Sequence, residues 1–183
     1  SLFRVPDTQI DLWEVTKDAA ARNPGRGDPR LFVNDSKKVH LGKHRRNRLG
    51  RTVCAFRRIL ETDATLPGWL AAAPSGAAHW RRQVPWLVTE EGPLCPLTSA
   101  SQARLDASLL RRGLEKEGCA LVGLGARVVP ALEWNALLKQ HGGKGGALFS
   151  VAIEILQHML GTTQPAPLRV ECDRHGGRQR YAK

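Results

Sequence analysis

The sequence predicts an α/β fold, and three observations lead to that class. An apolar run rich in valine and leucine spans residues 119–129 and predicts a buried strand. Two helical patterns follow it, and a second short strand is predicted over residues 168–172. This order of strand, helix, helix and strand is typical of a crossover between parallel or mixed strands. With 183 residues, 42% of them hydrophobic, the chain is expected to form a single domain.

Besides a basic helix at residues 43–60, a short helix and two irregular stretches are predicted before residue 99. Three consecutive alanines favour a helix over residues 10–21. Residues 23–30 hold two prolines and two glycines, a composition typical of a loop. Residues 61–98 are broken by many more prolines and glycines and form an irregular Pro/Trp-rich insertion. We expect its tryptophans to anchor it to the core, with base stacking beside neighbouring arginines as the alternative.

A basic amphipathic helix is predicted over residues 43–60. Apolar residues recur there at helical spacing, at Leu49, Val53, Phe56 and Leu60. Lysine, arginine and histidine are dense in the same range and fall largely on the other sides of the helix. Such a face can follow a phosphate backbone, and Arg45 and Arg46 are its candidate contacts. The alternative is a face that is merely solvated.

The pentad Asn34-Asp35-Ser36-Lys37-Lys38 precedes that helix. Its first three side chains can each cap a helix, which leaves amide donors and two lysines at the N-terminal end. Cations are mildly unfavourable at that end, so the lysines suggest an external anion such as a backbone phosphate. A solvated cap is the alternative.

The second half of the chain contains three predicted helices. The first spans residues 99–117 and ends at Gly118. The second begins at Pro130, because proline suits the first helical position. The third spans residues 144–160, where an apolar stripe is clear, and it ends at Gly161. The glycine-rich turn before it lacks the spacing of a nucleotide-binding P-loop.

Charge and cysteine content limit the partners and the compartment. Lys and Arg number 28 against 17 Asp and Glu, a net charge of +11 that favours polyanions, nucleic acid above all. The four cysteines form no C-x-x-C pair, which argues against a zinc site and favours reduced thiols in a cytoplasmic protein. No apolar run is long enough for a membrane span, and we expect no signal peptide. We expect no membrane partner and a monomer.

The stretch from residue 168 to residue 178 is where chemistry is expected. Asp173 follows the predicted strand and precedes two glycines. A carboxylate in that position can hold a divalent metal, although an aspartate that starts a turn is the alternative. Arg174, Arg178 and Arg180 surround it and are candidate phosphate contacts.

Three motifs, taken in order, resemble those of the type 2 ribonucleases H (ribonuclease HII). They are NDSKK before a basic helix, RVVPALEWN across a strand and a helix start, and VECD followed by glycines. The resemblance covers about residues 31–60 and 119–180. It implies a ribonuclease H-like mixed sheet flanked by helices. It also implies cleavage of RNA within RNA–DNA hybrids with Mg²⁺ or Mn²⁺.

The resemblance also assigns roles to particular residues. Asp173 matches one of the family's four acidic metal-site residues, which work together in a two-metal mechanism. Ser36, Lys37 and Lys38 match a segment that helps to hold the nucleic-acid backbone. Asp35 is expected to act as a cap or an ion-pair partner and not as a metal ligand.

The sequence departs from the family pattern in several places. The family's Asp-Glu pair and following Gly-Arg-Gly have no counterpart on a first strand, and Gly25-Arg26-Gly27 lies in a proline loop. The family's last metal-site Asp has no counterpart after Asp173 either. We therefore expect this chain to be the central part of a longer, divergent domain. Two alternatives are a non-catalytic basic nucleic-acid-binding module of the same fold and a structural protein of a large RNA complex.

Overall fold

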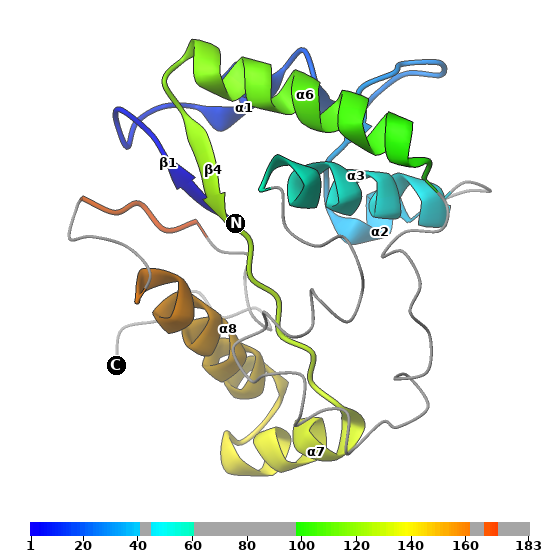
Figure 1. The fold of residues 1–183 in the computed structure, drawn as a ribbon. Helices are drawn as coiled ribbons and strands as arrows, with labels where there is room; N and C mark the ends of the chain where they lie inside the picture. Colours follow the sequence, from blue (N-terminus) through cyan, green and yellow to red (C-terminus); the bar gives the residue numbers. More distant parts are fainter. Residues whose placement is uncertain (41–44, 61–97, 162–166, 172–183) are drawn as a thin grey trace. The chain divides into compact units, whose positions relative to one another are not determined.

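The computed structural model describes residues 1–40, 45–60, 98–161 and 167–171, which form two compact units (Figure 1). The first unit comprises residues 1–40, 45–60 and 98–124, and the second comprises residues 125–161 and 167–171. The first unit contains both helices and short strands. The predicted α/β class is therefore confirmed at the level of a mixed fold with small sheets. The expected insertion lies, up to residue 97, outside the described residues.

The first unit contains two short two-stranded sheets. In one, β1 (Leu2–Arg4) pairs antiparallel with β4 (Ala120–Gly123), so that Phe3 lies opposite Leu121. In the other, β2 (Ala20–Ala21) pairs parallel with β3 (Leu31–Phe32). The strand predicted over residues 119–129 is confirmed in position, but only its first third is paired.

Helix α1 (Leu12–Thr16) is shorter than predicted. It begins where the Asp11 side chain accepts a hydrogen bond from the Trp13 amide, at 2.8 Å. The alanines that favour a longer helix are instead taken by the parallel pairing of β2 with β3. Tertiary pairing here overrides alanine's local preference for helix.

The end of α6 (Ala100–Lys116) follows the expectation that Gly118 stops it. The Gly118 amide donates to the Glu115 carbonyl at 3.0 Å, and the Cys119 amide donates to the Leu114 carbonyl at 2.8 Å. Gly118 adopts a φ of +65°, which an L side chain rarely tolerates. Together these bonds form a Schellman motif, and its apolar contact is between buried Leu114 and Cys119.

The core of the first unit lies between α6 and α3 (Arg45–Ile59), which pack against each other. Two clusters of buried residues fill it, one made by Ala19, Ala20, Leu31, Ala55 and Leu110 and the other by Leu114, Cys119 and Leu121. Phe56 and Ile59 of α3 contact both clusters. A Cβ on Gly113 would lie 2.8 Å from the Val15 carbonyl oxygen, so this glycine allows the approach of α1 to α6.

The second unit contains α7 (Ala131–Gln140) and α8 (Lys144–Leu160). Pro130 stands one position before the helix, at the N-cap, and the bounds of α8 are those that the apolar stripe predicts. The turn between the helices uses positive φ angles at Gly142 and Gly143. Within the described ranges of the chain, no helix has the length and apolarity that a membrane crossing requires.

The strand predicted over residues 168–172 is not found in the part that is described. Leu168 and Val170 alternate with the ion-paired Arg169 and Glu171, as a half-buried strand would require. However, Leu168 and Val170 are 50% and 48% exposed, and residues 167–171 pair with no described strand. A strand depends on backbone pairing with a neighbour, which alternation alone does not provide. Residue 172 lies outside the described residues.

Candidate nucleic-acid interface

Residues 36–60, which we call the basic segment, carry a dense run of positive charge. They include nine Lys and Arg residues and no Asp or Glu. The segment folds into α2 (Ser36–Val39) and α3, and the two helices pack against each other. Val39, which is 2% exposed, anchors α2 to the unit. The charge is therefore presented by two packed helices.

Asp35 caps α2, as predicted. Its carboxylate accepts a hydrogen bond from the Lys37 amide at 2.7 Å, and its carbonyl accepts one from the Lys38 amide at 2.9 Å. Asn34 fixes the approach to this turn, because its amide nitrogen donates to the Arg22 carbonyl at 2.7 Å. Of the amide donors expected at this helix end, those of Lys37 and Lys38 are therefore both taken by Asp35.

The polar side chains of α2 nevertheless face solvent. Ser36, Lys37 and Lys38 are all exposed, and no carboxylate among the described residues pairs with either lysine. An external phosphate would therefore meet two ammonium groups and a hydroxyl on this short helix, rather than a row of free amides.

The expected division of α3 into an apolar and a basic face is partly wrong. Leu49 was expected on the apolar face but is 41% exposed, whereas Ala55 and Arg57 are buried. Arg51 also turns toward the unit and meets α6. A helix whose buried face includes arginines cannot be recognised from the spacing of its apolar residues alone.

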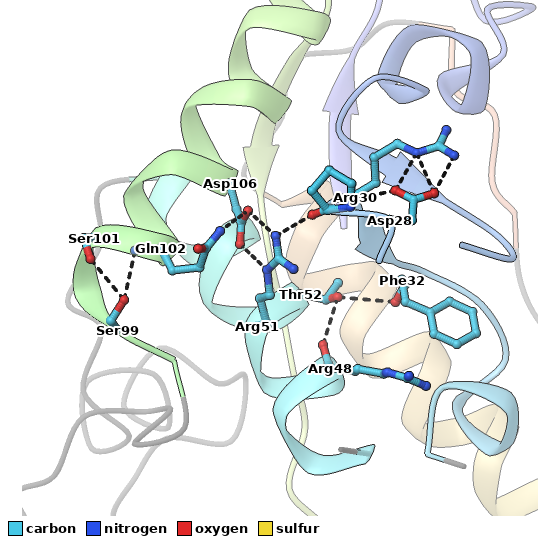
Figure 2. A network of polar contacts seen from close by, with 11 residues as sticks. Asp28, Arg30, Phe32, Arg48, Arg51, Thr52, Ser99, Ser101, Gln102 and Asp106 are labelled. Carbon is cyan, nitrogen blue, oxygen red and sulfur yellow. Dashed lines mark hydrogen bonds and ion pairs between the residues drawn. The ribbon is translucent and has the colours of Figure 1, made fainter. Parts of the chain in front are cut away.

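Asp106 of α6 neutralises Arg51 inside the fold (Figure 2). The Arg51 Nε donates to Asp106 Oδ2 at 2.6 Å, and Nη2 donates to Oδ1 at 2.7 Å and to the Pro29 carbonyl at 2.7 Å. Gln102 Nε2 donates to the same carboxylate at 2.9 Å, and Asp106 is only 3% exposed. The hydrogen bond to Asp106 raises the pKa of the Arg51 guanidinium. Arg51 therefore joins α3 to α6 and is not available to an outside anion.

Arg48 behaves differently although it lies on the same helix. It is exposed, and its guanidinium carbon lies 5.8 Å from the centre of the Phe32 ring (Figure 2). Among the described residues no carboxylate binds it. Arg58, further along α3, is also exposed. The basic segment thus presents at least four cations outward, namely Lys37, Lys38, Arg48 and Arg58.

The remaining predicted site residues are not placed by the structure. Arg45 and Arg46 lie in the first turn of α3, but their side chains are outside the described residues. Asp173, Arg174, Arg178 and Arg180 are outside them as well. In the part of the chain that is described, no group of three or more His, Cys, Asp or Glu side chains could hold a metal ion.

Comparisons with known proteins give no relative. No protein-family model, no curated protein and no solved structure matches this chain. Its function must therefore be argued from its own residues.

The second unit holds a further charged cluster, which has a structural role. Arg127 donates to Glu154 Oε2 at 3.1 Å and to the Val128 carbonyl at 2.6 Å, and it also pairs with Glu133. Its side chain is 5% exposed, and the two carboxylates belong to α8 and α7. Burial works against the charge of Arg127, yet its two carboxylate partners raise its pKa. This arginine fastens the segment before α7 to both helices.

Proposed function

We propose that this protein binds nucleic acid through the basic segment, with the phosphate backbone as its main ligand. The observation that carries the proposal is a run of 25 residues with nine Lys and Arg and no carboxylate, whose described residues form mainly two packed helices. Phosphate contacts by Lys and Arg supply most sequence-independent affinity for nucleic acid. They also fix the register of a protein on its ligand.

The position of the charge along α3 supports an external anion. Arg45, Arg46 and Arg48 lie in or next to the first turn, which contains no acidic residue. The N-terminal end of a helix carries a partial positive charge, so arginines there are unfavourable in the free protein. A bound phosphate group is negative, so it would interact favourably both with this end of the helix and with the arginines.

The ion pair of Arg51 inside the fold helps to identify which cations can bind an outside anion. Arg51 already has a buried carboxylate, so its charge serves the fold. The exposed cations of α2 and α3 have no carboxylate partner among the described residues. The protein therefore separates arginines that hold the helix in place from cations that face outward.

Binding can be tested by titrating labelled RNA–DNA hybrid and duplex DNA with the protein at several salt concentrations. Replacing Lys37 and Lys38 together by Gln should weaken binding to all sequences. It should also reduce the slope of log affinity against log salt by about 2, roughly one for each lost phosphate contact. The matched control replaces the exposed Lys139 and Lys144 by Gln. Equal effects of the two double variants, or no binding by the unaltered protein at low salt, would contradict the proposal.

A second candidate function is cleavage of RNA in RNA–DNA hybrids by a ribonuclease H-like domain. The ordered motifs NDSKK, RVVPALEWN and VECD favour it. Two divalent ions need oxygen ligands from several acidic groups, and the described residues do not provide that set. If Mg²⁺ or Mn²⁺ is bound, Asp173 is the residue that the resemblance assigns to it. A non-catalytic binder of the same fold is the competing possibility.

Cleavage is tested on a labelled hybrid with the full-length protein, including any sequence outside residues 1–183, in the presence of Mg²⁺ or Mn²⁺. The nuclease proposal expects metal-dependent products that the Asp173→Asn variant no longer forms, while a Glu115→Gln control retains them. Equal activity of the Asp173→Asn variant would remove Asp173 from the metal site. Hybrid binding without any cleavage would favour the non-catalytic module.

A further inference from the structure

An aromatic ring and a guanidinium group lie together at the edge of the basic segment. Phe32 is the last residue of β3 and is partly exposed, and the exposed Arg48 stands over its ring at 5.8 Å (Figure 2). Both groups are flat, and both present a face on which a third flat group can stack.

The backbone holds these two residues in place. Phe32 pairs with Ala21 in the parallel sheet, and its neighbour Leu31 is 1% exposed. The Thr52 hydroxyl lies 3.2 Å from the Arg48 carbonyl oxygen and 3.4 Å from the Phe32 carbonyl oxygen. Thr52 thus connects the end of β3 to α3 beside Phe32 and Arg48. A ligand would meet a site whose backbone is already positioned.

The pair contributes little that the fold needs. Arg48 is exposed, and a cation–π contact in water is a weak interaction. Arg51, one turn further along the same helix, has a bidentate partner and links α3 to α6. Arg48 therefore keeps its charge and its planar face available for a ligand.

We propose that Phe32 and Arg48 form a stacking subsite for an unpaired nucleobase, so that the preferred ligand of the basic segment contains single-stranded nucleotides. Bases stack on aromatic rings and on guanidinium planes with little dependence on sequence. The cations of α2, which packs against α3, are suited to the phosphates of the same strand. Bases inside a duplex are paired and stacked on one another, so they cannot occupy the subsite. This inference rests on the proposed binding function and adds the class of ligand.

The experiment compares a single-stranded oligonucleotide with a duplex of the same length. Phe32→Leu removes the flat ring but keeps an apolar side chain, and Arg48→Lys keeps the charge but removes the planar group. Each should lower affinity for the single strand by about fivefold or more, and Phe32→Leu should leave the salt slope and the duplex affinity unchanged. Phe32→Tyr should retain the affinity. Arg112→Lys, at an exposed position of α6, is the matched control and should change nothing.

A direct readout of stacking uses 2-aminopurine in the single strand, because its fluorescence falls when the base stacks. Quenching by the unaltered protein and by Phe32→Tyr, but not by Phe32→Leu or Arg48→Lys, is the expected result. If duplex binding persists and Arg48→Lys leaves both quenching and single-strand affinity unchanged, the subsite is wrong and the binding function stands. If the unaltered protein binds neither ligand at low salt, both proposals fail. Arg48 is exposed, so Arg48→Lys should fold normally. It therefore tests the subsite even if Phe32→Leu fails to fold.

Discussion

Two arginine–aspartate pairs in the first unit share the same chemistry but differ in what they connect (Figure 2). Arg51 and Asp106 are 55 positions apart and join α3 to α6, and Asp106 is 3% exposed. Arg30 and Asp28 are two positions apart in one loop, where Arg30 is 40% exposed on its side chain. Both pairs use two guanidinium nitrogens on one carboxylate. Because its carboxylate is more deeply buried and its partners lie far apart in the chain, we expect the Arg51–Asp106 pair to contribute more to folding than the Arg30–Asp28 pair.

The largest expected effect comes from removing the buried carboxylate. Asp106→Asn should lower the free energy of unfolding by about 3 kcal/mol, because it leaves a partly buried guanidinium without its counter-charge. Chemical unfolding followed by circular dichroism would measure this. Glu115→Gln, an exposed change on the same helix, should have little effect. If Asp28→Asn cost as much as Asp106→Asn, the distinction between the two pairs would be wrong.

A smaller effect is expected when both members of the buried pair are removed together. The double variant Arg51→Met with Asp106→Leu leaves no charge uncompensated and can pack as an apolar contact. Its loss of stability should be less than the summed losses of the single variants by about 2 kcal/mol. Unfolding experiments on the three variants form a double-mutant cycle. Additive losses would show that the two side chains do not act as a pair.

The smallest expected effect is a change in the pKa of Asp28, in the exposed Arg30–Asp28 pair. The hydrogen bonds from Arg30 lower the pKa of the Asp28 carboxyl. Because the folded-state pKa is the lower one, the stabilisation is present above the unfolded-state pKa and is lost as pH falls through the folded-state value. Arg30→Gln should therefore raise the Asp28 pKa in a carboxyl NMR titration, whereas Arg26→Gln should not. An Asp28 pKa that is unchanged by Arg30→Gln would assign the shift to the loop backbone.

Local signals in the sequence predicted much of the secondary structure. The cap at Asp35, the stop at Gly118 and the bounds of α8 all depend on neighbours within a few residues, so sequence patterns were sufficient. The strand at residues 168–172 was wrong over its described part because pairing needs a partner that local alternation cannot supply. The helix over residues 10–21 was too long for the converse reason: β3 recruits Ala20 and Ala21 from a distance.

The candidate site was predictable in composition but not in geometry. The sequence placed Lys37 and Lys38 at the N-terminal end of a capped helix, and the structure has them in α2 behind the Asp35 cap. The roles of Arg48 and Arg51 depend on Phe32 and Asp106, which lie far away in the chain. An aspartate among the leucines of α6 was the one available signal, since a buried carboxylate requires a partner. Nothing in the sequence says which arginine provides it.

The long sequence separation between Arg51 and Asp106 also imposes an order in time. At about 5–20 residues per second, the ribosome adds Asp106 roughly 3 to 11 s after Arg51. For most of that interval the nascent basic segment has none of α6 to pack against, and β1 still lacks β4. Contacts that span so much of the chain also slow folding, because the loop must close before the contact can form. The charges of the basic segment are therefore exposed earlier, and more completely, on the nascent chain than in the folded protein.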